Sequence, residues 1–270
     1  MCAMARGTND AVPAIVRRQR MLELIGEHGF ARVSELSDAF EVSDVTVRSD
    51  LDILDEHRAI RRVHGGAVLR GGLGLRELSF EESLESSAEE KRRIAWAAAD
   101  LVESGSSILL DVGTTTAAIA RALVARDDLE DVTIVTNGLT IALDLEEAIP
   151  RFHVIVTGGS LRPLQHSLVE PMASIVLAQL HVDLAFIGCN GVHSTRGVTN
   201  LNLPEADVKR LMVASSRKAV VVADGSKIGQ VHLGKVAAVS EIDTLITGET
   251  APPEVLEQLR AAGLGVVVAA

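Results

Sequence analysis

Residues 43–51 have the sequence Ser-Asp-Val-Thr-Val-Arg-Ser-Asp-Leu and give the chain its clearest structural signal. Ser43 is a good helix N-cap because its hydroxyl can accept a hydrogen bond from a backbone N–H of the first turn. Val47, Leu51 and Leu54 then lie at positions i, i+4 and i+7, which places them on one face of a helix. The segment therefore predicts a helix that begins at Ser43 and packs through these three apolar residues.

The opposite face of this helix is small and polar near its N-terminus, where it carries Asp44, Thr46, Arg48 and Ser49. In a helix-turn-helix, the N-terminal residues of the second motif helix reach the base edges of DNA. Arg is the commonest reader of guanine, and Thr contacts bases or phosphates. We therefore interpret Thr46 and Arg48 as candidates for base readout. Further candidates for contact with DNA are Ser34, Ser43, Asp44 and Ser49.

Two short helices are predicted ahead of this one, as the motif requires. The first ends at Gly29, and the second begins with Ser34 as its N-cap. The residues that the second helix is expected to turn inward are Leu36, Ala39 and Phe40. The N-terminal part of the chain therefore fits a three-helix unit.

The segment that follows, residues 58–66, has the sequence Arg-Ala-Ile-Arg-Arg-Val-His-Gly-Gly. It is interpreted as a short β-hairpin, or wing, whose cations would contact DNA phosphates. The candidate residues are Arg58, Arg61, Arg62 and His64. The alternative is a plain three-helix bundle with a solvated basic edge, but the polar face of the third helix and the position of these cations favour DNA binding.

The overall charge argues against a protein that coats nucleic acid, because the 270 residues carry a formal net charge of −11. The arginines near the N-terminus nevertheless fall in two clusters, one at the wing and one at Arg17, Arg18 and Arg20. A local basic stripe can bind DNA although the rest of the chain is acidic. Aromatic residues make up only 2% of the chain, which disfavours recognition of single strands by base stacking.

Several other classes of protein are disfavoured by the sequence. Cys2 and Cys189 offer neither a disulfide framework nor a CxxC metal motif, and the eight histidines show no HxxxH spacing. Residues 229–235 imitate a P-loop but lack its Ser or Thr, and no GxGxxG follows a predicted strand. We therefore expect no metal ion and no cofactor. No signal peptide or membrane span is predicted either, so we expect a soluble, cytoplasmic protein without a membrane partner.

The remainder of the chain alternates strand and helix patterns, which predicts an α/β fold with a mostly parallel sheet covered by helices. Strands are predicted at residues 108–111, 132–135, 154–157, 184–187, 219–223, 244–247 and 266–268. Helices are predicted at 115–125, 139–147, 168–179, 204–215 and 253–261, and another begins at Ser87, where Glu90 completes a capping box. We therefore divide the chain into a winged helix-turn-helix domain at residues 14–69, a linker at 70–87 and an effector-sensing α/β domain at 88–268.

Ligands of open α/β sheets bind beyond the carboxyl ends of the strands. The first predicted strand is followed by Asp111-Val-Gly-Thr-Thr-Thr116, which opens a helix. Gly113 allows the backbone to approach a ligand closely, and the hydroxyls of Thr114, Thr115 and Thr116 suit a phosphate together with the N–H groups of the helix. The alternative is an ordinary Thr-capped turn, but three Thr after a Gly favour anion binding.

Glycine and polar residues also follow the next predicted strands. The candidates are Asn137 after the second strand, Gly158, Gly159 and Arg162 after the third, and Asn190 and Gly191 after the fourth. An Asn could hydrogen-bond a sugar hydroxyl. On local grounds these motifs could also be simple turns, with Arg162 solvated.

Two pairs of charged residues complete the predicted site. Glu205 and Lys209 lie four apart on one helix, so that Glu205 could hold Lys209 toward the pocket or form only a surface ion pair. Asp224 and Lys227 flank a turn after the fifth strand, where Asp224 could accept hydrogen bonds from a sugar and Lys227 could pair with its phosphate. A solvated turn is the alternative for this second pair.

These motifs together resemble the DeoR family of bacterial repressors. The resemblance at the N-terminus rests on residues 43–51, Leu54 and Arg61-Arg-Val-His-Gly-Gly-Ala67. In the remainder it rests on Asp111-Val-Gly-Thr-Thr115, Thr136-Asn137, Gly158-Gly159, Gly188-Cys-Asn-Gly191, Glu205-Ala-Asp-Val-Lys209 and Asp224-Gly-Ser-Lys227, in matching order. The sequence departs from the family pattern at Ser49, where a cation is usual, and at Glu82-Ser83, where many members place an Arg.

The resemblance implies a winged helix-turn-helix and a sensor domain related in fold to sugar-phosphate isomerases. It implies a transcription regulator and not an enzyme, with repression relieved by a phosphorylated sugar or a related metabolite. The expected partners are a double-stranded DNA operator, this effector and further copies of the chain, as a dimer or tetramer. The alternative is a sugar-phosphate isomerase fused to a helical domain, but an isomerase has no need of a wing.

Overall fold

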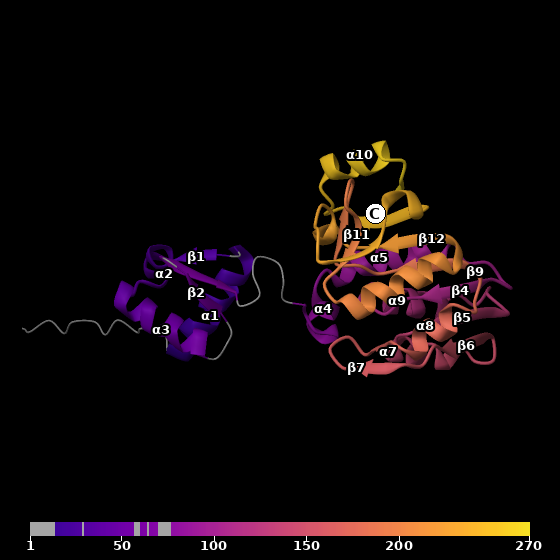
Figure 1. Cartoon of the computed structure of the whole chain (residues 1–270), viewed down its shortest axis with the longest axis horizontal. Coiled ribbons are helices and arrows are strands. Elements are labelled where there is room, and N and C mark those ends of the chain that lie inside the picture. Colours follow the sequence, from indigo (N-terminus) through magenta and orange to yellow (C-terminus); the bar gives the residue numbers. More distant parts are fainter. Residues whose placement is uncertain (1–13, 29, 57–59, 64, 70–76) are drawn as a thin grey trace, which may run out of the picture. The chain divides into compact units, whose positions relative to one another are not determined.

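The computed structural model describes the chain except for residues 1–13, 29, 57–59, 64 and 70–76 (Figure 1). The chain divides into an N-terminal unit, residues 1–76, and a C-terminal unit, residues 77–270. Each unit has a hydrophobic core of its own, one in the N-terminal unit and one on each face of the main sheet in the C-terminal unit.

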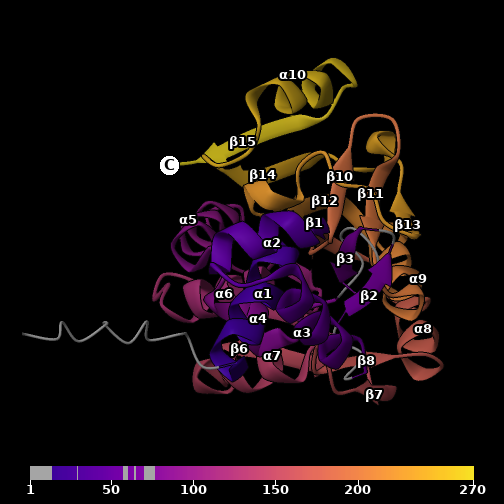
Figure 2. The same ribbon diagram turned by 90° about the vertical axis from the view of Figure 1, so that its left-hand side faces the viewer.

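The N-terminal unit contains three helices and a three-stranded antiparallel sheet, as the winged helix-turn-helix prediction requires. Its elements in chain order are α1 (Ala14–His28), β1 (Phe30–Arg32), α2 (Val33–Phe40), α3 (Asp44–Glu56), β2 (Ile60–Val63) and β3 (Gly66–Leu69). The strand order is β1-β3-β2, so the predicted hairpin is extended by a strand that lies between α1 and α2 in the sequence. Figure 2 shows the three helices beside this small sheet.

The core of the N-terminal unit is built from the residues that the helical periodicity predicted. Val47 and Leu51 of α3 are completely buried and Leu54 is nearly so, together with Met21 and Ile25 of α1. Burial of each large aliphatic side chain contributes roughly 1.5–3 kcal/mol to stability. Three turns of α3 are therefore fixed against α1, which leaves the opposite side of α3 outside the core.

A buried ion pair joins α1 to α3. Arg17 Nε lies 2.6 Å from Asp50 Oδ2, and Arg18 Nη1 lies 3.5 Å from Asp50 Oδ1. Only 9% of Arg17 is exposed. The prediction that Arg17 belongs to a basic stripe for DNA is therefore wrong, because its guanidinium compensates a carboxylate in the interior.

The start of α2 also differs from the prediction. The helix begins at Val33, directly after β1, so Ser34 lies inside the first turn and is not the N-cap. The carboxylate of Glu35 instead accepts a hydrogen bond from the backbone N–H of Arg32, 2.9 Å away. Ala39 is exposed and Phe40 is half-buried, because only Val33 and Leu36 face the core from this short helix.

The C-terminal unit is organised around a seven-stranded sheet in which all neighbouring strands are parallel, which confirms the predicted α/β class. Its strands are β4 (Ser107–Leu110), β5 (Val132–Thr136), β6 (Phe152–Val156), β9 (Val182–Ile187), β12 (Ser216–Val222), β14 (Thr244–Gly248) and β15 (Gly265–Ala269). Their order in the sheet is β15-β14-β12-β9-β4-β5-β6. All seven predicted strands are present, with ends that differ by a few residues.

Helices cover both faces of this sheet because the strands alternate their apolar side chains between two cores. Ile108 and Leu110 face one core, whereas Leu109 faces the other. The first core includes α5 (Ala88–Ala99), α6 (Thr114–Val124), α7 (Leu139–Asp144) and the short η1 (Glu146–Ala148). The second includes α8 (Met172–Leu177), α9 (Leu203–Ala214) and α10 (Pro253–Ala261). Among the described residues, none of these helices has the length and apolar character that a bilayer crossing needs.

Two small antiparallel sheets extend the loops that leave the carboxyl ends of the strands. A hairpin follows β6, made of β7 (Ser160–Arg162) and β8 (Ser167–Val169). The other sheet contains β10 (Gly191–His193), β11 (Gly197–Asn200) and β13 (Gly234–Ala237), and the short η2 (Gly225–Lys227) and η3 (Val239–Glu241) lie on either side of β13 in the sequence. The helix predicted at 168–179 is therefore too long, because its first residues pair with β7 as a strand. The P-loop imitation at residues 229–235 leads into β13, whereas a P-loop opens a helix.

The segment that precedes α5 is structured, although the sequence placed it in a linker. It contains α4 (Phe80–Glu85), where Ser79 and Glu82 form a capping box, with Ser79 N 2.8 Å from Glu82 Oε2. The capping box predicted at Ser87 and Glu90 is wrong. Ser87 makes no side-chain cap, and the carboxylate of Glu90 is buried and accepts a hydrogen bond from the hydroxyl of Thr250 at 2.8 Å. The carboxylate of Glu90 therefore binds a residue that is distant in the sequence and not the start of its own helix.

Gly159 provides a test of the loop between β6 and β7. Its φ is +131°, and a Cβ at this position would overlap the carbonyl oxygen of Val169 in β8. Gly263 also has a positive φ, +92°, but a Cβ there would meet no atom within 4 Å. We expect Gly263→Ala to lower the free energy of unfolding by ~1–2 kcal/mol through backbone strain, and Gly159→Ala to lower it by at least ~1 kcal/mol more. Urea unfolding followed by circular dichroism measures both, and equal losses would contradict the close packing of the two strands.

Candidate functional site

The N-terminal face of α3 is exposed and polar. Ser43 caps the helix as predicted, because its Oγ accepts a hydrogen bond from the backbone N–H of Thr46 at 3.2 Å, and the two hydroxyl oxygens are 2.9 Å apart. Arg48 Nη2 lies 3.9 Å from Asp44 Oδ2, with more than half of each side chain exposed. Such an exposed pair is worth less than ~1 kcal/mol, so Arg48 can exchange Asp44 for another partner at little cost.

Val45 is a member of this face that the sequence analysis missed. It is 76% exposed, between Asp44 and Thr46. An apolar side chain in this position can contact the methyl group of thymine in the major groove. The signal was present in the sequence, because Val45 does not fit the i, i+4, i+7 pattern that buries Val47, Leu51 and Leu54.

The wing is fastened to α3 through Arg62. Its Nη1 donates to the carbonyl oxygen of Arg48 at 3.1 Å and also bonds Asp52 Oδ1. The backbone N–H of Arg62 lies 3.4 Å from Asp55 Oδ2. Part of the Arg62 guanidinium is therefore committed within the unit, and it orients β2 beside the exposed face of α3.

The other predicted DNA contacts are distributed as follows. Ser34 is exposed on α2, and Ser49 is exposed on α3. Arg61 belongs to β2, although only its backbone is described. Arg58 and His64 lie outside the described residues. The structure therefore keeps four predicted residues of α3 outside its buried side: Asp44, Thr46, Arg48 and Ser49.

The centre of the C-terminal unit's site is a buried ion pair between Asp111 and Lys209. Asp111 follows β4 and is fully buried, and Lys209, on α9, is only 3% exposed. Lys209 Nζ donates to Asp111 Oδ2, which also accepts a hydrogen bond from the backbone N–H of Gly188 at 2.9 Å. Within the described structure, the other oxygen of this carboxylate, Oδ1, is buried and has no hydrogen-bond partner.

Burial and charge shift the pKa of both members of this pair. Burial raises the pKa of Asp111 to about 6, although the attraction of Lys209 opposes this shift. Burial alone would lower the pKa of Lys209, but the attraction of Asp111 and Glu205 outweighs it and raises the pKa. At neutral pH the site therefore holds an ammonium and a carboxylate in contact.

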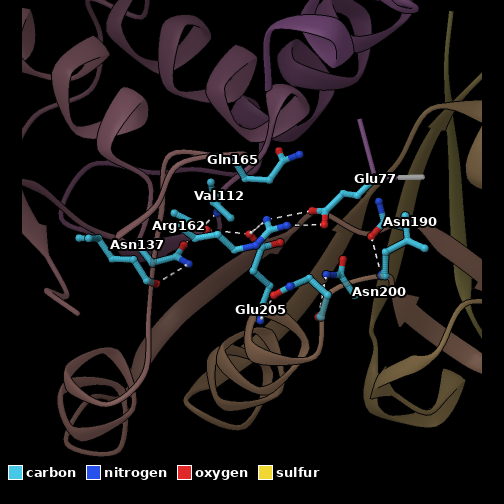
Figure 3. Close-up of polar contacts among 12 residues, drawn as sticks. Glu77, Val112, Asn137, Arg162, Gln165, Asn190, Asn200 and Glu205 are labelled. Carbon is cyan, nitrogen blue, oxygen red and sulfur yellow. Dashed lines mark hydrogen bonds and ion pairs between the residues drawn. The ribbon is translucent and has the colours of Figure 1, made fainter. Parts of the chain in front are cut away.

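A second ion-pair network is centred on Arg162 (Figure 3). Arg162 Nη1 donates to Glu77 Oε1 at 3.0 Å and to Glu205 Oε1 at 2.8 Å, and Arg162 Nη2 bonds the other oxygen of Glu77. Ser167 Oγ donates to the same oxygen of Glu205 at 2.6 Å. Arg162 is therefore not a solvated loop residue, and Glu205 pairs with Arg162 while Lys209 pairs with Asp111.

Two predicted asparagines use their side-chain amides to bind backbone groups of the loops around the site (Figure 3). Asn137 is completely buried; its Oδ1 accepts a hydrogen bond from the N–H of Val112 at 2.9 Å, and its Nδ2 donates to the carbonyl of Leu168 at 3.3 Å. Asn190 Oδ1 accepts from the N–H of Leu201 at 2.8 Å. These side chains fix the loops that surround the charged residues.

The predicted Thr-rich turn opens α6, with Gly113 as the N-cap at φ +147°. Thr116 is fully buried and donates to the carbonyl of Gly113 at 2.9 Å, so it closes the turn. Thr114 and Thr115 keep a small exposed fraction. Thr114 also lines a pocket of about 450 Å³ whose other residues come from α4, α5 and α6.

The remaining predicted residues lie at the same edge of the sheet. Gly158 and Gly159 lie between β6 and β7, and Gly191 opens β10. Asp224 follows β12 and caps η2, where its Oδ1 accepts from the N–H of Ser226 at 3.1 Å, and Lys227 ends η2.

Lys91 and Cys189 also belong to the surroundings of the site. The sequence analysis missed Lys91, whose Nζ donates to the carbonyls of Ser83 and Ser86, each at 2.5 Å. Burial lowers the pKa of Lys91, and the attraction of Asp224 opposes this. Burial raises the pKa of the Cys189 thiol to about 12, which disfavours its nucleophilic thiolate form.

We expect Asp111 to give the protein a defined pH dependence. Its pKa is about 6 in the folded protein against 3.8 for an ordinary, solvated Asp, so the folded state binds the proton more tightly. Its contribution to stability is therefore complete below about pH 4 and is lost as the pH rises through 6, a change on the order of 3 kcal/mol. Urea unfolding from pH 4 to 7 should show wild type losing stability relative to Asp111→Asn.

Asp183→Asn is the matched control for this measurement. The hydrogen bonds from Ser107 lower the pKa of Asp183, so its contribution to stability should have the opposite sign and grow as the pH rises. A difference between wild type and Asp111→Asn that does not change with pH would contradict the burial of this carboxylate.

Comparisons with known proteins agree with the two units. Residues 17–70 match the family model of the DeoR-like helix-turn-helix domain, and residues 86–249 match that of the DeoR C terminal sensor domain. A transcriptional regulator named GlpR from Haloferax volcanii is 36% identical over 93% of this chain and 96% of its own length. The glycerol-3-phosphate regulon repressor of Escherichia coli K12 is 30% identical over 90% of this chain and 94% of its own length.

A solved ribose 5-phosphate isomerase A from Methanocaldococcus jannaschii is 21% identical, with a TM-score of 0.39 over 53% of this chain and 55% of its own. The family matches, by contrast, span both units and are to regulators rather than enzymes, so the isomerase alternative is not favoured. The chain is a member of the DeoR family of DNA-binding transcriptional regulators.

Proposed function

We propose that this regulator is a repressor whose α3 enters the major groove of an operator and whose C-terminal unit binds a phosphorylated sugar or a related metabolite. The observation that carries the DNA half is the exposed polar face of α3, which lies on the side opposite the buried Val47, Leu51 and Leu54. In a helix-turn-helix this end of the helix contacts base edges. Thr46 and Arg48 are the proposed readers of sequence.

The other proposed DNA contacts position the helix and do not read bases. Phosphate contacts fix the register of a protein on the duplex and make affinity depend on salt. The proposed set is Ser34, Ser43, Ser49, Arg58, Arg61, Arg62 and His64, and Asp44 belongs to the same DNA-binding surface through its contact with Arg48. For Arg62 the role is shared, since its Nη1 already holds the wing to α3.

The effector is proposed to bind at the carboxyl edge of the sheet. The N-terminus of α6 offers backbone N–H groups and the hydroxyl of Thr115 to an anion, and Lys209 and Arg162 supply positive charge. The buried, unpartnered Oδ1 of Asp111 can accept a hydrogen bond from a sugar hydroxyl. The full proposed set is Asp111, Gly113, Thr114, Thr115, Thr116, Asn137, Gly158, Gly159, Arg162, Asn190, Gly191, Glu205, Lys209, Asp224 and Lys227.

The regulatory scheme follows from linkage. An effector changes operator affinity only by its differential affinity for the two states of the protein, typically ~1–3 kcal/mol. Paired half-sites need paired reading helices, so we propose that a dimer or tetramer binds the operator, in the cytoplasm where that DNA lies. We place the DNA-binding domain at residues 14–69 and the sensor domain at 88–268, joined by 70–87. A relative that represses a glycerol-3-phosphate regulon supports a small phosphorylated effector.

Arg48→Ala tests the readout. A duplex selected from a randomised library by the full chain serves as the operator, and fluorescence anisotropy measures its affinity for each variant at one fixed salt concentration. We expect Arg48→Ala to weaken binding about 10- to 100-fold, because a bidentate contact to a base is worth ~1–3 kcal/mol. Arg210→Ala, which removes an exposed Arg of α9 paired with Asp207, is the control and should bind like wild type. Unchanged affinity and base preference in Arg48→Ala would refute the assignment.

Thr115→Val tests the effector site. A ligand that binds only the folded state raises the melting temperature, so a thermal-shift screen with a panel of sugar phosphates should give at least one hit with wild type. We expect Thr115→Val, which removes one hydroxyl and keeps the shape of the side chain, to reduce that shift. Thr195→Val, at an exposed turn, is the control and should keep it. A hit of undiminished size in Thr115→Val would move the site away from α6.

A further inference from the structure

The carboxylate of Glu77 is bound to the guanidinium of Arg162, a group that is part of the effector site proposed above. The two side chains face each other with two hydrogen bonds, Nη1 to Oε1 at 3.0 Å and Nη2 to Oε2 (Figure 3). This fork is the geometry with which Arg also binds a phosphate. Glu77 is the first residue of the C-terminal unit, and its partner Arg162 lies 85 residues further along the sequence.

The charges around this contact disfavour the binding of a further anion. Two cations, Arg162 and Lys209, lie among three carboxylates, those of Glu77, Glu205 and Asp111. The cluster therefore has a formal charge of −1 when all five groups are ionised. A phosphate dianion would meet repulsion in this cluster unless one carboxylate left it, because like charges at close range in a partly buried site are costly.

Of the three carboxylates, that of Glu77 is the least restrained by burial and by other hydrogen bonds. Asp111 is completely buried, and Glu205 has 4% of its side chain exposed and a second donor in Ser167. Glu77 has 14% of its side chain exposed, and its described hydrogen bonds are all with Arg162. Burial raises the pKa of Glu77 although the hydrogen bond from Arg162 opposes this, so the carboxylate is held against a desolvation cost.

The segment that follows Glu77 is docked on the loop that carries Arg162. Phe80, at the start of α4, is buried, and its N–H donates to the carbonyl of Leu164 at 2.9 Å. Gln165 Nε2 donates to the carbonyl of Leu78 at 2.6 Å, and the ring of His166 lies 5.3 Å from that of Phe80. The same loop therefore holds the guanidinium and the segment that leads back, through residues 70–76, to the N-terminal unit.

We propose that Glu77 is an internal substitute for the effector's anionic group: a phosphate that binds Arg162 displaces Glu77 and loosens residues 77–86 from the sensor domain. The inference rests on the proposed function and adds how occupancy is transmitted. The chain between the wing and Glu77 is short, so the attachment of this segment constrains how the DNA-binding domains are presented. Effector binding removes this constraint by breaking the ion pair between Glu77 and Arg162.

Removal of the competing carboxylate should strengthen anion binding. Isothermal titration of the full chain with inorganic phosphate, at pH 7.5 and constant ionic strength, is carried out on wild type, Glu77→Gln and Glu85→Gln. Glu85 is an exposed residue of α4, so its variant makes the same change in net charge in the same segment. We expect Glu77→Gln to bind phosphate about tenfold more tightly than wild type, and Glu85→Gln to bind like wild type. Glu77→Ala should reproduce the gain.

The release step has an intrinsic reporter. Trp96 is the chain's single tryptophan, is 40% exposed and lines the pocket between α4, α5 and α6 together with Leu84 of α4. When α4 loosens, Leu84 withdraws and Trp96 becomes more accessible. We expect acrylamide quenching of Trp96 to increase in wild type on saturation with phosphate.

The outcomes separate this inference from the function on which it rests. Equal or weaker phosphate affinity in Glu77→Gln, while a sugar phosphate still binds wild type and responds to Thr115→Val, overturns the role of Glu77 and leaves the effector site standing. Unchanged quenching at saturating phosphate overturns the release of α4. If neither inorganic phosphate nor any sugar phosphate binds wild type or Glu77→Gln, the effector site itself is refuted, and the inference with it.

Discussion

The buried pair of Asp111 and Lys209 is the constraint around which the C-terminal unit is arranged. It joins the end of β4 to α9, and the N–H of Gly188, just beyond β9, binds the same carboxylate. At neutral pH, loss of either residue alone leaves the charge of the other buried and unpaired, at a cost of ~3–5 kcal/mol. A buried pair with so large a desolvation cost is weak evidence for stability by itself, and its position at the carboxyl edge of a parallel sheet is consistent with the effector site that we propose there.

The loops at that edge are organised so that the charged groups stay oriented. Asn137 and Asn190 use their amide groups to tie backbone segments together, and Thr116 closes the turn at the start of α6. Their contribution to a ligand site is therefore shape and rigidity. In the N-terminal unit, likewise, Arg17 and part of the Arg62 guanidinium bind groups of the same domain and hold α3 and the wing in position.

Sequence reasoning succeeded where the signal was local and periodic. All seven strands of the main sheet, the burial of Val47, Leu51 and Leu54, and the Ser43 cap follow from spacing alone. It failed where a distant partner decided the outcome. Glu90 does not complete the predicted capping box, because its carboxylate binds Thr250, 160 residues away. Residues 168–169 form a strand and not a helix, because they pair with β7. The pairing of Lys209 with Asp111 and of Arg162 with Glu77, over 98 and 85 residues, has no local signature.

The weak contact between Asp44 and Arg48 has a consequence for how such a helix searches a genome. The carboxylate of Asp44, one turn before Arg48, repels the phosphates that every stretch of duplex offers, and the chain as a whole carries a net charge of −11. In the readout that we propose, only a site whose base edges bind Arg48 offsets this repulsion. Such a surface would bind other DNA weakly and leave it quickly, so that more copies of the protein stay available for the operator.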